Sequence, residues 1–143
     1  MAKLHFLVSL ITKDNDYPME QVGVEIVYAD SDAITQSTQL SKVIQADTSL
    51  RPNAIVVEPL GATPFPKVAS AAASAGIGWA VVNREADYTS QLRQASPSPV
   101  FSVCVDQAEI GRIRGRQIAA LLPAGGSVLS IQGPSVGSVS RER

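Results

Sequence analysis

Polar residues that can bind a hydroxylated small molecule follow several of the predicted β-strands. These residues are Asn15, Tyr17, Glu58, Asn83 and Arg84. The carboxyl ends of parallel strands meet at one edge of a sheet, where ligands bind, so we expect these side chains to lie close together. Amide, carboxylate and guanidinium groups exchange hydrogen bonds with hydroxyls, and an aromatic ring can lie against the apolar face of a sugar. The pattern therefore predicts a site for a polyol.

The strand that precedes Glu58 is the clearest element of the sequence. Residues 54–57 form an unbroken apolar run rich in β-branched side chains, which is typical of a strand covered on both faces. Pro52 precedes the run, and Pro59 and Gly61 follow it, so turn signals bound it on both sides.

Strands and helices alternate along the rest of the chain. The predicted strands are residues 4–11, 24–28, 54–57, 79–82, 100–105 and 127–132. One predicted helix begins at Ser31 or Asp32, runs to about residue 46 and turns Ile34, Leu40, Val43 and Ile44 inward. A second covers residues 64–75, and a third follows Asp106 with Ile110, Ile113, Ile118 and Leu121 inward. This order predicts an α/β fold, a doubly wound and mostly parallel sheet of about six strands.

Two further segments complete this interpretation. Residues 83–99 are polar and rich in serine and proline, which predicts a surface loop, and a helix is expected from Ser138 onward. Trp79 lies in a predicted strand and is expected in the core. Cys104, also in a predicted strand, is interpreted as a small buried hydrophobic residue.

The first crossover of the predicted sheet is unusually short. Only 12 residues separate Ile11 from Val24, and a polar loop at 12–17 uses half of them. A parallel crossover with its helix needs about 10–12 residues, so a helix beginning at Pro18 has room for about one and a half turns. Such a helix leaves apolar strand surface uncovered, which predicts self-association or low stability.

Composition excludes several classes of function. The 143 residues carry 12 Lys and Arg against 13 Asp and Glu, so no basic excess indicates nucleic acid or an anionic membrane as a partner. The single cysteine and the single histidine, His5, cannot build a disulfide or a zinc site, and we expect neither metal nor cofactor. The apolar start resembles a short signal peptide, but Lys13 and Asp14 follow without a cleavage site, so it is interpreted as a strand. No stretch reaches the roughly 20 apolar residues of a membrane span.

Several short motifs resemble one known family. These are Asn15-Asp-Tyr-Pro18, Val82-Asn-Arg84, Val105-Asp106, and Ile131-Gln-Gly133 followed by Ser140-Arg-Glu-Arg143. In this order they resemble the periplasmic sugar-binding proteins of ribose-binding type, whose fold also forms the effector domain of lac-repressor-type regulators. The resemblance covers nearly the whole chain, residues 1–143, but only the N-terminal lobe of the family's two lobes.

The resemblance implies roles for individual residues. Asn15 and Tyr17 match the asparagine and first aromatic of a ligand-binding loop, and Asn83-Arg84 match an Asp-Arg pair that binds sugar hydroxyls. Arg141 matches the sugar-binding arginine near the hinge, and Glu58 takes the position of a polar ligand residue. Pro18 departs from the pattern by replacing a second aromatic, and Asn83 by replacing the aspartate.

The resemblance also implies a function and a location. It implies that the chain is a non-catalytic solute-binding lobe of an ABC-transporter-type protein in the periplasm. The implied ligand is a sugar or polyol, and the implied partner is the missing second lobe. Because the chain carries no signal peptide, a cytoplasmic location is the alternative. The alternative functions are an effector-binding lobe of a transcriptional regulator and an assembly module that no longer binds sugar.

Two other classes of protein fit the residues poorly. A phosphoacceptor receiver module needs an aspartate where Glu58 stands and a late lysine, yet no lysine follows Lys67. A hydrolase of this fold class needs a general base beside its nucleophile, and the single histidine, His5, lies at the wrong end of its strand to act as one.

Overall fold

A parallel sheet of five strands is the centre of the computed structural model, which describes residues 4–10, 23–60, 65–84, 86–129 and 131. The strand order is β2-β1-β3-β4-β5, and every neighbouring pair is parallel. The strands are β1 (His5–Leu10), β2 (Gly23–Tyr28), β3 (Ala54–Val57), β4 (Gly78–Val82) and β5 (Val100–Val103). The predicted α/β class with a parallel sheet is confirmed, and the strand order is that of a doubly wound fold.

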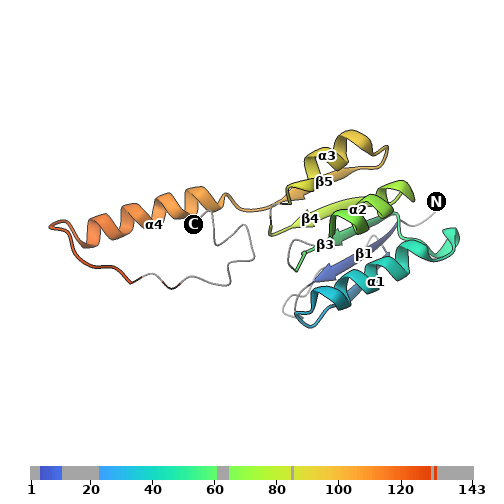
Figure 1. Ribbon diagram of the computed structural model, residues 1–143, viewed down its shortest axis with the longest axis horizontal. Coiled ribbons are helices and arrows are strands. Elements are labelled where there is room, and N and C mark those ends of the chain that lie inside the picture. Colours follow the sequence, from blue (N-terminus) through green and yellow to red (C-terminus); the bar gives the residue numbers. More distant parts are fainter. Residues whose placement is uncertain (1–3, 11–22, 61–64, 85, 130, 132–143) are drawn as a thin grey trace.

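Three helices lie side by side on one face of this sheet (Figure 1). They are α1 (Ala33–Gln45), α2 (Phe65–Ser74) and α3 (Tyr88–Ala95), and a short 3-10 turn, η1 (Thr48–Leu50), follows α1. Of the two N-caps predicted for α1, the structure selects Asp32, whose carboxylate accepts hydrogen bonds from the N–H groups of Ile34 and Thr35. These bonds satisfy donors that the first helical turn leaves without partners.

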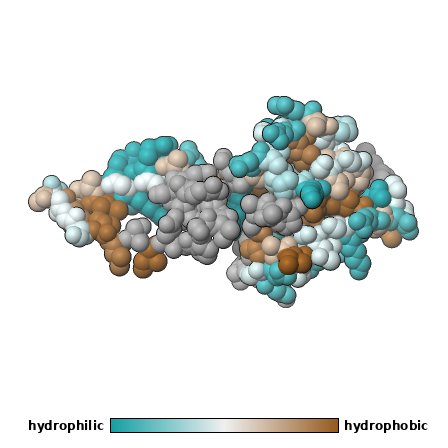
Figure 2. Space-filling model, viewed as in Figure 1, coloured by the Kyte–Doolittle hydropathy of each residue, from teal (hydrophilic) through white to brown (hydrophobic). Residues whose placement is uncertain are grey.

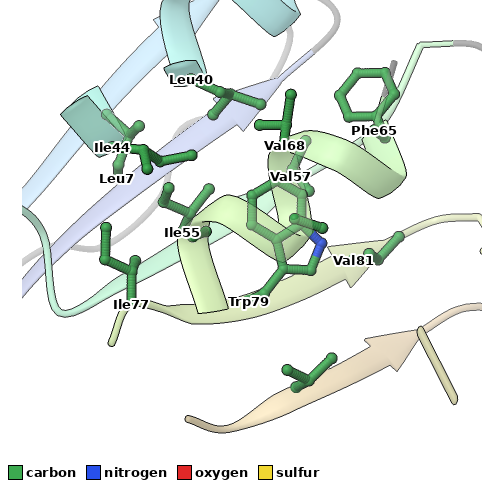
Figure 3. Packing of buried hydrophobic residues seen from close by; sticks show 13 residues of the cluster. Leu7, Leu40, Ile44, Ile55, Val57, Phe65, Val68, Ile77, Trp79 and Val81 are labelled. Carbon is green, nitrogen blue, oxygen red and sulfur yellow. The ribbon is translucent and has the colours of Figure 1, made fainter. Parts of the chain in front are cut away.

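The core fills the space between the sheet and these helices (Figure 3). Alternate residues of β3 and β4 point toward the helices, because successive side chains of a strand face opposite sides. The largest of them is Trp79, which is 1% exposed, so its predicted place in the core is confirmed. The buried side chains labelled in Figure 3 are Leu7, Leu40, Ile44, Ile55, Val57, Phe65, Val68, Ile77, Trp79 and Val81.

The opposite face of the sheet is apolar and remains partly open in the described part of the chain. Phe6 and Val8 of β1 and Val56 of β3 are only half-buried there. On the edge strand β5, Phe101 and Val103 are 48% and 59% exposed. Parallel sheets are normally covered on both faces, but no described helix covers this face.

The fourth helix, α4 (Gln107–Leu121), extends away from the sheet (Figure 1). We predicted that its apolar side faces inward, and this prediction is wrong. Ile113, Ile118 and Leu121 are 41%, 40% and 79% exposed, and Ile110 is half-buried. Figure 2 shows hydrophilic atoms along one side of α4 and hydrophobic atoms near its far end. The helix has the expected amphipathic pattern, but it is not packed extensively against any other described element.

The segment between β4 and β5 also differs from the prediction. Residues 83–99, expected to be a loop, contain α3. Tyr88 and Leu92 lie one helical turn apart and pack against the core, which stabilises a helix that the polar composition conceals. This apolar pair is too short a pattern to stand out in the sequence.

The predicted sixth strand is absent from the described residues at 127–129 and 131. Val128, Leu129 and Ile131 are 55%, 87% and 89% exposed. A strand forms only beside a hydrogen-bonding partner, and these residues do not lie beside β5, so the sheet has five strands rather than about six.

A few smaller differences concern single residues. Ile34, predicted to face the core, is 75% exposed because it lies at the first turn of α1, beyond the edge of the cluster. Cys104 is half-buried rather than buried, since β5 ends one residue before it. The helices predicted after Pro18 and from Ser138 onward lie outside the described residues. None of the described helices has the length and apolar character needed to cross a membrane.

Candidate functional site

The candidate site lies where the order of the strands reverses. The chain passes from β1 to β2 on one side and then returns to β3 on the other side of β1. Such a switch point opens a crevice beyond the carboxyl ends of the two central strands, which is where open α/β sheets bind ligands. Glu58 follows β3 directly, at this crevice.

Glu58 continues the hydrogen bonding of the sheet for one residue beyond β3. Its backbone N–H donates to the carbonyl oxygen of Ser9 in β1, at 2.9 Å. Glu58 is half-buried and Pro59 is buried, so the chain turns close to the sheet rather than leaving it at once.

A buried amide that the sequence analysis did not single out holds this turn. Gln36 of α1 has no exposed surface. Its Nε2 donates to the Glu58 carbonyl oxygen at 2.8 Å and to Ser9 Oγ at 3.1 Å, and its Oε1 accepts from the N–H of Leu60 at 2.9 Å. A signal was present, because Gln36 lies four and eight residues before Leu40 and Ile44, on the apolar stripe of α1.

Asn83 and Arg84 lie at the same edge of the sheet, one strand further along. β4 is the neighbour of β3, and Val57 pairs with Val81, so both strands end at nearly the same level. Adjacent strands are about 4.8 Å apart. Glu58 and Asn83 therefore share one edge, as the sequence analysis predicted for these two positions.

The backbone at Asn83 has an unusual conformation. Its φ angle is +62°, in the left-handed region where asparagine is enriched among non-glycine residues. Its N–H donates to the carbonyl oxygen of Val103 in β5 at 2.9 Å, which fixes the turn against the next strand. The side chain of Asn83 is exposed, and Arg84 is half-buried.

The side chains at this edge have no structural partners within the described residues. No described residue forms a hydrogen bond or an ion pair with the side chain of Glu58, Asn83 or Arg84. Asn53, at the opposite edge, differs, because its Oδ1 accepts a hydrogen bond from the His5 N–H at 2.8 Å and so has a structural role.

The remaining residues of the predicted site cannot be placed. Asn15, Tyr17 and Arg141 lie outside the described residues. The structure therefore brings together Glu58, Asn83 and Arg84.

A separate hollow lies between the start of α3 and β5. Its volume is about 240 Å³, and it is lined by Ala86, Asp87, Thr89, Ser90, Arg93 and Ser102. Arg93 Nε donates to the Val100 carbonyl oxygen at 2.7 Å, so this arginine also ties α3 to β5. None of the residues predicted to bind ligand lines this hollow.

Beyond β5, charged residues stabilise the start of α4. Asp106 accepts a hydrogen bond from the Glu109 N–H at 2.8 Å, which confirms its predicted capping role. Hydrogen bonds from Arg112 and Arg116, at 2.7 and 2.8 Å, lower the pKa of the Glu109 carboxyl. In the described part of the chain, no group of three His, Cys, Asp or Glu side chains is placed to hold a metal ion.

Comparison with known families gives a match over most of the sequence. The family model described as a periplasmic binding protein domain matches residues 13–143. The chain belongs to this family. In this member of the periplasmic binding protein family, the switch point of the strand order and the polar residues after β3 and β4 lie at the carboxyl ends of the strands.

Solved structures support the same fold. One is a solute-binding protein of an ABC transporter from Actinobacillus succinogenes with bound D-allose, with a TM-score of 0.78 and 17% identity over 99% of this chain and 52% of the other. Another comes from Bacillus halodurans with bound myo-inositol, with a TM-score of 0.77 and 17% identity over 98% of this chain and 49% of the other.

A third similar structure comes from a signalling protein. It is the fructose-binding periplasmic domain of a hybrid two-component system, with a TM-score of 0.75 and 20% identity over 97% of this chain and 46% of the other. The chain thus spans about half the length of the solved structures it matches. A search of the curated proteins finds no match.

Proposed function

We propose that the chain binds a sugar or a polyol at the carboxyl edge of its sheet, as one lobe of a two-lobed, non-catalytic solute-binding protein of ABC-transporter type. The observation that carries this proposal is the shared position of Glu58 and Asn83-Arg84 beside the switch point, with side chains that no described residue engages. A carboxylate, an amide and a guanidinium can satisfy several hydroxyl groups at once.

The other predicted contacts belong to this proposal. Tyr17 would supply the aromatic surface, and Asn15 and Arg141 would add further hydrogen-bond donors and acceptors. Two of the similar structures hold D-allose and myo-inositol, and the third is a fructose-binding domain. All three compounds are rich in hydroxyl groups and carry no net charge. Their shared chemistry supports a neutral polyol as the ligand class.

A second lobe would complete the binding site. Proteins of two lobes close around a ligand by hinge motion, and binding pockets bury most of a small ligand. Residues 1–143, as one lobe, would leave half of the ligand in contact with water. Affinity is therefore expected to be much higher in a protein that carries both lobes. Membership of the family supports a periplasmic location, and a cytoplasmic location is the alternative.

Calorimetric titration with a panel of pentoses, hexoses and inositols tests the proposal. Binding of at least one of them, weakened by substitution of Arg84, would support it. If none binds and a chemically unrelated solute does, the proposed ligand class is wrong.

Two alternatives remain for the same fold. An effector-binding lobe of a lac-repressor-type regulator would bind the same kind of ligand but would be joined to a DNA-binding segment. An assembly module would instead use the open apolar surface at Phe101 and Val103 to contact a second copy of the chain. Sugar titration separates the assembly module from the other two, because it alone binds no sugar.

A further inference from the structure

We propose that Gln36 is a positioning residue for the binding edge, because its amide holds residues 58–60 in the conformation that presents Glu58 to a ligand. This inference rests on the proposed function above. Gln36 itself does not reach the candidate ligand surface, since it has no exposed surface.

Each polar atom of the buried Gln36 amide has a hydrogen-bond partner. A buried amide is costly unless its polar atoms are paired. Both Nε2 and Oε1 of Gln36 are paired, through bonds to Ser9 Oγ, the Glu58 carbonyl oxygen and the Leu60 N–H. An apolar side chain would fill the same space without these bonds. The specific contribution of the amide is therefore to hold the turn at residues 58–60, and not to fill the core.

The Gln36 amide also matches the shape of the turn after β3. The carbonyl of Glu58 and the N–H of Leu60 flank Pro59, which has no N–H of its own. The Gln36 amide pairs with both groups, as the backbone of a neighbouring strand would, and thereby extends the hydrogen bonding of the sheet past the end of β3.

The place of this contact in the fold supports the same role. Gln36 joins α1 to β1 through Ser9 and to the segment after β3 through Glu58. These two strands border the switch point of the sheet. The same amide thus fixes the distance between the two sides of the crevice where the proposed ligand binds, and preorganisation of this kind lowers the cost of binding.

The chain offers a matched control on the same helix. Gln39 of α1 is half-buried, and its Nε2 donates to the Tyr28 carbonyl oxygen at 2.9 Å. This contact lies at the end of β2, away from Glu58. A substitution of Gln39 therefore removes one amide-to-carbonyl bond of α1 without touching the turn at residues 58–60.

The test compares Gln36→Met with Gln39→Met, since methionine is unbranched and of similar length. Backbone amide exchange at Leu60, followed by NMR, reports on the turn without any ligand. Titration with the panel of pentoses, hexoses and inositols reports on binding. We expect the Leu60 amide to exchange more than about tenfold faster in Gln36→Met alone. We also expect sugar affinity to fall about tenfold in Gln36→Met and to stay unchanged in Gln39→Met.

The possible failures are distinguishable. Unchanged exchange at Leu60, or equal loss of affinity in both variants, would overturn the positioning role. Absence of sugar binding by the wild type would overturn the proposed function, and Leu60 exchange would still decide whether Gln36 holds the turn. If Gln36→Met does not fold, Gln36→Glu replaces it. The carboxylate of that variant can still accept a hydrogen bond from the Leu60 N–H, but when ionised it cannot donate to the Glu58 carbonyl oxygen. We therefore expect weaker sugar binding, with the Leu60 amide still protected from exchange. Unchanged sugar binding would overturn the positioning role.

Discussion

Asn83 and Val103 are joined by a hydrogen bond of 2.9 Å from the N–H of one to the carbonyl oxygen of the other. This bond ties the residue after β4 to the end of β5 and holds Asn83 at a φ of +62°. The conformation turns the chain at the edge where the proposed ligand binds. The backbone of Asn83 therefore has a structural role, which can be separated from the role in binding that is proposed for its side chain.

Substitution of Asn83 by glycine or by alanine separates these roles. Glycine adopts positive φ without steric cost, so Asn83→Gly should keep the stability of the wild type and lose sugar affinity. Asn83→Ala should lose the same affinity and also about 1 kcal/mol of stability. Urea unfolding and calorimetric titration measure the two effects. Equal stability of the two variants would contradict the backbone argument, and wild-type affinity in both would remove the Asn83 amide from the site.

Substitution of Arg84 by alanine should weaken sugar binding without a comparable change in stability. Loss of hydrogen bonds from a charged group costs about 1.5–3 kcal/mol of binding free energy. Arg114, exposed on α4, is a suitable control, because Arg114→Ala removes the same charge away from the edge of the sheet. Titration of both variants with the same sugar decides the matter. If they bind equally well, Arg84 does not contact the ligand.

The buried contact between Trp79 and Tyr88 predicts a stability effect. The indole N–H donates to the Tyr88 hydroxyl at 3.4 Å, so Tyr88→Phe leaves a buried donor unpaired. Because the bond is long, we expect a loss of about 1 kcal/mol in the free energy of unfolding near neutral pH. Denaturant unfolding of the variant measures this loss, and stability equal to the wild type would contradict it.

The same tyrosine predicts a dependence on alkaline pH. Burial raises the pKa of the Tyr88 hydroxyl above its ordinary value of 10.0, although the bond from Trp79 opposes this shift. The folded state therefore holds the proton more tightly than the unfolded state. Its contribution is complete below pH 10 and is lost as pH rises toward the folded-state pKa. As the pH rises above 10, the wild type should therefore lose more stability than Tyr88→Phe. Parallel pH dependence of the two proteins would contradict this.

The open face of the sheet predicts self-association. Phe101 and Val103 expose apolar surface on the edge strand β5, where a second copy of the chain can pack. The double variant Phe101→Ser and Val103→Thr should associate less than the wild type at equal concentration. Sedimentation velocity measures this. A wild-type chain that remains a compact monomer would contradict the prediction.

The parts of the fold that follow from local sequence were predictable. The apolar run at β3 and the capping residues Asp32 and Asp106 act over a few neighbouring residues, so their signals survive in the sequence. The shared edge of Glu58 and Asn83 followed from one rule about parallel strands. These features do not depend on which distant elements pack together.

The parts that depend on distant partners were not predictable. The apolar side of α4 shows that the helix can pack, but only the fold shows that it leaves the sheet. The helix α3 is stabilised by contacts of Tyr88 and Leu92 with the core. These two apolar residues lie in a polar segment, so the sequence alone does not indicate a helix there. Gln36 is a polar residue on the apolar stripe of α1, so the sequence shows that it is unusual. Its role cannot be predicted, because its hydrogen-bond partners lie in a turn more than 20 residues away.

Calorimetric titration of the wild type, Asn83→Gly and Arg84→Ala with pentoses, hexoses and inositols tests the central claim most directly. The account predicts saturable binding of at least one of these compounds by the wild type and much weaker binding by both variants. Binding that both substitutions leave unchanged, or no binding of any of these compounds by the wild type, would contradict it.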